Sequence, residues 1–140
     1  MTITLDQART AIRATFDAAA EKGLKPLSAV VLDAGGHVVA FERQDKASPG
    51  RFAIAHGKAF GCVMLGLPGS AQMKRAEDQA YFMNAVNGLF GGQVVPVPGG
   101  LLIVEGETVV GAMGVTGDTS DNDAEAGMAG LAAAGLDGRV

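Results

Sequence analysis

The stretch LLIVEGETVVGAMGVTG, residues 101–117, decides the fold class. Its two apolar runs flank a turn at residues 105–107, and the glycine in that turn supplies the positive φ that tight hairpins need. The segment LSAVVLDAGGHVVAFERQD, residues 27–45, has the same form and turns at residues 33–36. Hairpins make antiparallel pairs, so we predict an α+β fold: a central antiparallel β-sheet of two hairpins flanked by helices.

Helices are expected on both sides of each hairpin. Apolar spacing, helix-start signals and glycine or proline stops predict helices over residues 4–23, 51–66 and 70–87, and an alanine-rich helix from Ser120 onward. The expected helix caps are a capping box of Thr4 with Gln7, the hydroxyl of Ser70, and a capping box of Ser120 with Asp123. The glycine- and proline-rich residues 88–100 are expected to form a loop.

The bulk composition narrows the class of protein. A chain of 140 residues predicts a single domain over residues 1–140, and the lone Cys62 forms no internal disulfide. A net charge of −4, six Phe, one Tyr and no Trp argue against a nucleic-acid partner. We see neither a signal peptide nor a membrane span, and expect a cytoplasmic protein without a membrane partner. An apolar content of 48% favours self-association, although a tight core of small residues is an equal explanation.

The glycine- and aspartate-rich stretch GAMGVTGDTSDND, residues 111–123, fits no known cofactor loop. Its acidic residues lack the glycine and glutamate of an EF-hand, and its glycine spacing is not that of a dinucleotide fingerprint. The structural interpretation is that Gly111 and Gly114 lie where another backbone or a ligand comes close, and that the acids complement a helix dipole.

Two motifs resemble the GlcG/HbpS family, also called the haem-degrading or PduO C-terminal-like family. They are PGGLLIVEGETVVGAMGVTGDTSDNDAEAGMAGLAA at residues 98–133 and VVLDAGGHVVAFERQD at residues 30–45. The helix with AIAHGKAF carries the Lys58-Ala59 pair of the family. The resemblance implies a profilin-like fold and homo-oligomers, dimers or larger. It also implies either haem or corrinoid-related ligands or a place in glycolate or aromatic-acid breakdown. Residues 73–92 depart from the family.

His56 is the most informative single residue. It lies four residues after Phe52 and four before Phe60, so it projects from an aromatic helix face. A neutral imidazole there is suited to ligating haem iron, while the alternative is a core or interface histidine with a satisfied N–H. His37, in the hairpin turn, is expected to face solvent.

Basic side chains near this helix are candidates for holding an anion. Arg51 and Lys58 share a helix face, and Arg43 ends the preceding strand, so the three form a candidate clamp for a carboxylate such as a haem propionate. Solvated surface charge is the equal alternative. The resemblance also points to Gly99, Gly100, Gly114 and Thr116 as a pocket lining.

The leading hypothesis is a small oligomeric ligand-binding protein that binds haem, with His56 as the metal ligand. The first rival is an enzyme that acts on a small aromatic or hydroxy acid and uses the same basic side chains for the carboxylate. The second rival is an accessory subunit whose apolar surface serves assembly only. The sequence assigns no catalytic residue.

Overall fold

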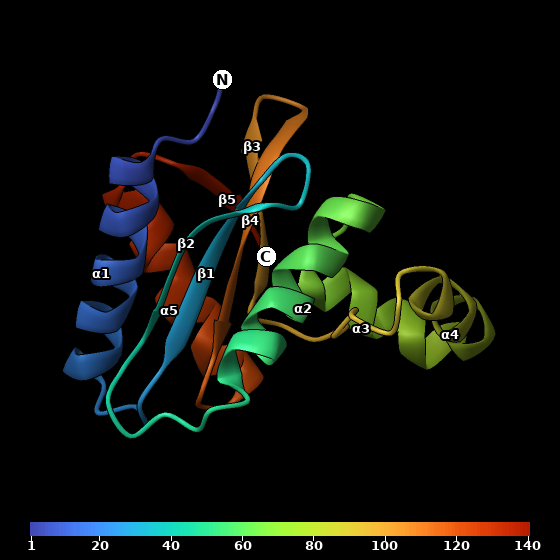
Figure 1. Cartoon of the computed structure of the whole chain (residues 1–140), viewed down its shortest axis with the longest axis horizontal. Coiled ribbons are helices and arrows are strands. Elements are labelled where there is room, and N and C mark those ends of the chain that lie inside the picture. Colours follow the sequence, from blue (N-terminus) through green and yellow to red (C-terminus); the bar gives the residue numbers. More distant parts are fainter.

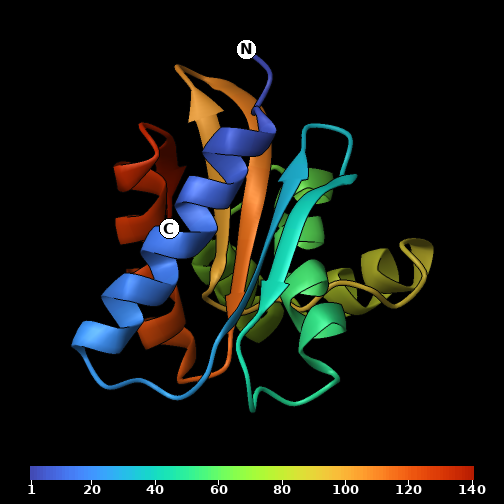
Figure 2. The same cartoon turned by 60° about the vertical axis from the view of Figure 1, so that its left-hand side comes forward.

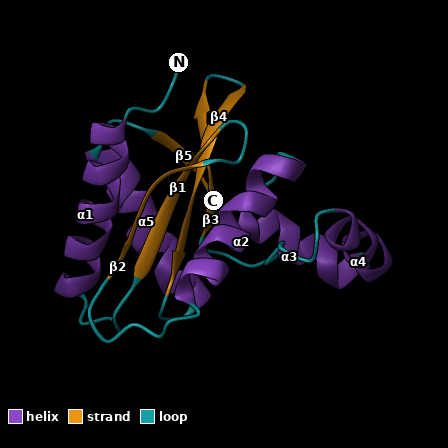
Figure 3. Ribbon diagram, viewed as in Figure 1, coloured by secondary structure: helices purple, strands orange, loops and turns teal.

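The computed structural model describes all 140 residues and forms an α+β fold in which one antiparallel sheet lies between two layers of helices (Figures 1 and 3). The helices are α1 (Leu5–Glu21), α2 (Arg51–Leu65), α3 (Gly69–Asp78), α4 (Ala80–Leu89) and α5 (Ser120–Ala133). The strands are β1 (Ser28–Asp33), β2 (Val38–Arg43), β3 (Gly100–Glu105), β4 (Thr108–Thr116) and β5 (Asp137–Arg139). Their order across the sheet is β2-β1-β4-β3-β5.

The two faces of the sheet carry separate cores. Helices α1 and α5 cover one face, where Ile12, Val31 and Leu131 are fully buried, and α2 covers the other face, against Val30 and Leu32 (Figure 2). Successive residues of a strand point to opposite faces, so β1 is apolar at every position from Ala29 to Leu32 rather than alternating. The continuous run in the sequence therefore marks a strand that is covered on both sides.

Glycine lets the layers approach closely. A Cβ at Gly114 in β4 would overlap the Ala55 carbonyl of α2, and a Cβ at Gly111 would overlap the Leu32 carbonyl of β1. Both predicted close approaches are thus contacts with protein backbone. The contact at Gly114 places α2 directly against the centre of the sheet.

Both predicted hairpins and the Thr4–Gln7 capping box are confirmed. The helix predicted over residues 70–87 is wrong in its extent, because Gln79 leaves the helical region (φ −140°, ψ 60°) and divides it into α3 and α4. Ser70 caps nothing, since α3 begins after the extended Pro68. Strand β5, which the sequence did not indicate, pairs with β3.

The cap of the last helix is shifted by one residue from the prediction. Thr119, not Ser120, is the N-cap, and its hydroxyl accepts a hydrogen bond from the Asn122 amide. Asp123 is buried instead of completing a capping box. Its Oδ1 accepts a hydrogen bond from the Asp118 backbone amide, and its Oδ2 reaches across the core to Lys58.

Helix α4 stands apart from the rest of the molecule. It contacts only α3 among the helices and strands, and it projects from the body at the far side of α2 from the sheet (Figure 1).

None of the helices combines the length and the apolarity that a membrane crossing requires.

Candidate functional site

Helix α2 presents two chemically different faces. Ala55, Lys58, Ala59 and Cys62 follow helical spacing and are buried against the sheet. Phe52, His56 and Phe60 follow the same spacing on the other side, where Phe52 is 41% exposed. The aromatic stripe predicted from the sequence is therefore the outer face of α2, and small residues form its inner face.

The outer face holds His56 in a stack of aromatic rings. The His56 ring centroid lies 5.8 Å from that of Phe52 and 5.5 Å from that of Phe60, with interplanar angles of 33° and 21°. Phe41 of β2 meets Phe52 edge-on, and Phe90 meets Phe60 edge-on. Packing on both ring faces restrains the imidazole and leaves its edge, which carries the two nitrogens, as the reactive part.

A largely apolar cavity of about 580 Å³ opens beside this stack. It is lined by Phe52, Ala53, Ile54, His56, Gly92, Gln93 and Val95. Neither nitrogen of His56 has a hydrogen-bond partner, and burial lowers the pKa of His56 from its ordinary value of 6.5. The site therefore offers an imidazole that burial biases toward its neutral form, at an apolar surface and without a partner among the atoms of its own chain.

The inner face of α2 holds a buried ion pair. The Lys58 ammonium lies 3.2 Å from the Asp123 carboxylate of α5 and donates to the Val115 carbonyl of β4 at 2.9 Å. The Lys58 and Asp123 side chains are only 4% and 1% exposed. Burial lowers the pKa of Lys58, against the opposing effect of the Asp123 charge, and burial raises the pKa of Asp123. Lys58 is therefore not a solvated surface charge, and its ammonium is already paired inside the chain.

The glycines predicted to line a pocket surround this ion pair. A Cβ at Gly100 would lie 2.5 Å from the Lys58 carbonyl oxygen and 2.9 Å from the Cys62 sulfur. Gly99 has φ +104°, and a Cβ there would lie 2.9 Å from the Lys58 Nζ. Protein atoms of α2 thus fill the space beside Gly99, Gly100 and Gly114.

Two residues that the sequence analysis placed in the site, Arg51 and Thr116, are in direct contact. Arg51 donates to the Thr116 hydroxyl at 2.8 Å, and its charge helps to lower the pKa of Lys58. Arg43 is exposed and pairs in register with Ser28, which pairs in turn with Thr116. Cross-strand partners share a face of the sheet, so Arg43 belongs to the α2 side.

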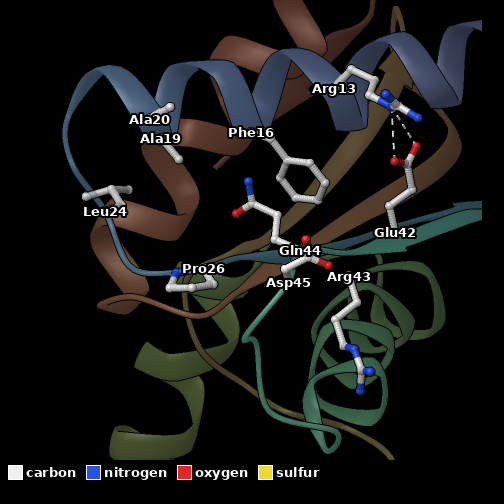
Figure 4. Close-up of a pocket in the computed structure, with 10 residues that line it drawn as sticks. All are labelled: Arg13, Phe16, Ala19, Ala20, Leu24, Pro26, Glu42, Arg43, Gln44 and Asp45. Atoms are coloured by element: carbon white, nitrogen blue, oxygen red, sulfur yellow. Dashed lines mark hydrogen bonds and ion pairs between the residues drawn. The ribbon is translucent and has the colours of Figure 1, made fainter.

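Arg43 also borders the cavity between α1 and β2, about 520 Å³ in volume, where Arg13 and Glu42 form an ion pair at 3.0 Å (Figure 4). Figure 4 shows the Arg43 guanidinium pointing away from α1 and from that cavity.

The predicted site residues fall into two groups. His56 lies on the outer face of α2, and Lys58, with the glycines around it, lies on the inner face.

Sequence reasoning missed Asp123 as the partner of Lys58. Its position in the first turn of a helix suggested a capping role, and only the packing of α5 beside β4 brings the two charges together. The sequence gives no signal that distinguishes Asp123 from its neighbours, because Asp121 and Glu125 are acidic residues on the same helix. Cys62 is no nucleophile, since burial raises its pKa to about 12.

Comparison with known proteins places this geometry in a family. Residues 3–132 match the family described as haem degrading protein HbpS-like. No protein of curated function matches the chain.

Solved structures share the fold over nearly the whole chain. A double mutant of HbpS from Streptomyces reticuli is 28% identical, with a TM-score of 0.80 over 94% of this chain and 86% of that one. The Klebsiella pneumoniae protein ORFY is 25% identical, with a TM-score of 0.84 over 96% and 92% of the two chains. PduOC, solved as a haem complex, is 18% identical, with a TM-score of 0.86 over 98% of each chain. The chain belongs to the HbpS-like family.

Proposed function

We propose that this protein binds haem or a related tetrapyrrole, with His56 as the axial ligand of the metal. One observation carries the proposal: His56 presents a neutral imidazole with no hydrogen-bond partner at the edge of a large apolar cavity. Haem iron is commonly held by a neutral histidine nitrogen.

The residues present suit a flat apolar macrocycle. A volume of about 580 Å³ lies within the roughly 300–1,000 Å³ range of small-molecule and cofactor sites. Phe52 offers an exposed aromatic ring beside His56, and Gly92, which has no side chain, is among the residues that line the cavity. The family description and the haem complex of PduOC, which shares the fold, lend support.

Each residue has a separate part in the proposed site. Phe52 and Phe60 fix the plane of the imidazole, His56 supplies the metal ligand, and the apolar wall excludes water from the ligated side. Arg43 and Arg51 remain the candidates for propionate carboxylates, whereas Lys58 is committed to Asp123. A bound haem would supply an iron capable of redox chemistry.

An optical titration with hemin tests the proposal. The wild-type protein is expected to give a saturable shift of the Soret band at one hemin per chain, and His56→Ala is expected to weaken hemin binding at least tenfold. His37→Ala is the matched control, because His37 is an exposed histidine in the β1–β2 turn and is expected to leave binding unchanged. Equal binding by His56→Ala and wild-type protein would remove His56 from the site.

The dependence of hemin binding on pH provides a second readout. Burial holds the pKa of His56 below its ordinary value of 6.5, so the imidazole stays neutral, and able to ligate iron, under mildly acidic conditions. We expect affinity to persist at pH 6.5 and to fall only at lower pH, as the ring gains a proton. Binding that halves already above pH 6.5 would contradict the assignment.

We propose in addition that the protein forms homo-oligomers through the arm formed by α3 and α4. Tyr81 and Leu89 of α4 are 73% and 82% exposed, which leaves apolar surface without a partner at the end of a projecting element. Light scattering after gel filtration is expected to give a multiple of the 14.1 kDa chain mass, and Leu89→Ser to lower it. Val38→Ser, which replaces a 48% exposed apolar side chain on edge strand β2, is the control. A monomeric wild-type protein would refute the proposal.

A further inference from the structure

A small cavity of about 230 Å³ lies at the start of α2 and shares no lining residue with the His56 cavity. It forms where the α1–β1 connection, the β2–α2 loop and the end of β4 meet. We call it the basic pocket, and its lining residues are Lys25, Pro26, Lys46, Ala47, Ser48, Arg51 and Gly117.

The charge of this pocket is unbalanced. Lys25, Lys46 and Arg51 line it together, and no acidic side chain is among the lining residues. None of the three forms an ion pair within the chain. Asp118 lies nearby, but its carboxylate accepts hydrogen bonds from the Lys25 and Thr119 amides and from the Asn122 side chain. The charge of Lys25 is partly offset by the nearby Asp118 carboxylate, whereas Lys46 and Arg51 have no acidic partner. The pocket therefore keeps an excess of positive charge, which favours a bound anion.

The pocket also offers hydrogen-bond donors. Ser48 contributes a hydroxyl to the pocket wall, and Arg51 keeps N–H groups beyond the one that it donates to Thr116. The pocket lies at the N-terminus of the 15-residue helix α2, which has neither a side-chain cap nor an acidic residue in its first turn. Unpaired amides at such a terminus attract negative charge.

One buried polar atom at this end of the sheet has no hydrogen-bond partner within the chain. Ser28 is fully buried, its hydroxyl forms no hydrogen bond, and it pairs in register with Thr116, the residue that Arg51 contacts. Buried hydroxyls in native proteins are normally satisfied. Ser28 is not among the lining residues of the basic pocket, so the evidence for an anion site lies in the three charges and the helix terminus.

We propose that the basic pocket is a binding site for a small dianion, either a phosphate group or a short dicarboxylate. The volume suits one such anion and is too small for a tetrapyrrole. A guanidinium binds carboxylate and phosphate oxygens in the same bidentate manner, so the two classes share the chemistry of recognition. The site shares Arg51 with the candidate propionate contacts, but it shares no lining residue with the His56 cavity.

Isothermal titration calorimetry at low ionic strength tests the site with three probes: inorganic phosphate, succinate and, as a monoanion control, acetate. We expect phosphate or succinate to bind saturably at one per chain and acetate to bind at least tenfold more weakly. Binding of phosphate alone identifies a phosphate-bearing ligand, and binding of succinate alone identifies an organic acid. Added NaCl is expected to weaken the interaction.

Two charge-removing variants locate the bound anion. Lys46 has a left-handed backbone (φ 72°), which asparagine tolerates well, so Lys46→Asn removes the charge without backbone strain. Lys46→Asn and Lys25→Gln are each expected to weaken anion binding about tenfold. Lys74→Gln, which removes an exposed charge on α3, is the matched control and is expected to leave binding unchanged.

Two results would overturn the proposal. One is the absence of saturable heat with both dianions, and the other is an equal loss of affinity in Lys74→Gln and Lys46→Asn, which would indicate only a general charge effect. A hemin titration of Lys46→Asn is expected to match that of the wild-type protein, so failure of the anion site and failure of the haem site are distinguishable.

Discussion

Replacing Lys58 by methionine tests the role of the buried ion pair that ties α2, β4 and α5 together. The substitution keeps most of the side-chain volume and removes the ammonium, leaving the Asp123 carboxylate 1% exposed without its counterion. Removing one partner of a buried pair costs about 3–5 kcal/mol. The Val115 carbonyl also loses its lysine donor. Since small domains are stable by only about 5–15 kcal/mol, the free energy of unfolding should fall by a large fraction.

The loss in Lys58→Met should depend on pH in a definite direction. Burial already raises the pKa of Asp123, and without Lys58 this pKa rises further, because the stabilising charge is gone. A carboxyl group whose folded pKa is raised binds more protons in the folded state, so stability falls as pH increases above the ordinary value of 3.8. The variant should therefore lose more stability at pH 7 than at pH 5, measured against the wild-type protein at each pH.

Urea unfolding followed by circular dichroism measures both effects. Arg13→Met, which breaks the exposed Arg13–Glu42 pair, is the control and should cost less than about 1 kcal/mol. The double variant Lys58→Met with Asp123→Leu should recover part of the loss, because it removes the unpaired charge. A cost below about 1 kcal/mol for Lys58→Met, or a cost that does not change with pH, would refute the reasoning.

Three further predictions follow from close packing and burial. Gly114→Ala should cost about 1–3 kcal/mol or more in urea unfolding, because its Cβ meets α2 backbone, whereas Gly88→Ala, with open space around it, should cost nothing; equal effects would contradict the packing. Cys62, with its pKa raised to about 12, should resist iodoacetamide at pH 8 until the protein unfolds, and rapid native labelling would contradict its burial. Hydrogen bonds lower the pKa of Asp118 to about 2, so its stabilising contribution is present above pH 3.8 and is lost as pH falls toward 2. In thermal melts, the melting temperature of Asp118→Asn should fall less steeply than that of the wild-type protein as the pH is lowered below 3.8. An equal fall in both proteins would contradict this role of Asp118.

The fold could be predicted from the sequence where local chemistry determines it. Glycines at both hairpin turns and the capping box at Thr4 act within a few residues, and the structure agrees with each. The break at Gln79 could not be predicted, because no proline or glycine marks it and the helical spacing continues across it. Strand β5 is three residues long and exists through its pairing with β3, a contact that only the tertiary structure supplies.

The candidate site was predictable in its residue types but not in its arrangement. The spacing of Phe52, His56 and Phe60 on one helix face follows from 3.6 residues per turn. Which face of α2 is buried depends on the small residues Gly100 and Gly114 opposite it, and these admit the Ala55–Lys58 side rather than the bulky aromatic side. Nothing in the sequence indicated a binding role for Lys46, because Lys46 reaches the basic pocket only when the β2–α2 loop folds back toward Lys25.

A crystal structure of the protein saturated with hemin tests the central claim most directly. The account predicts an iron–nitrogen bond to His56, with the macrocycle against Phe52 and in the cavity bordered by Gly92 and Val95. Iron bound through another residue, or a macrocycle on a different surface with both His56 nitrogens unbonded, would contradict it.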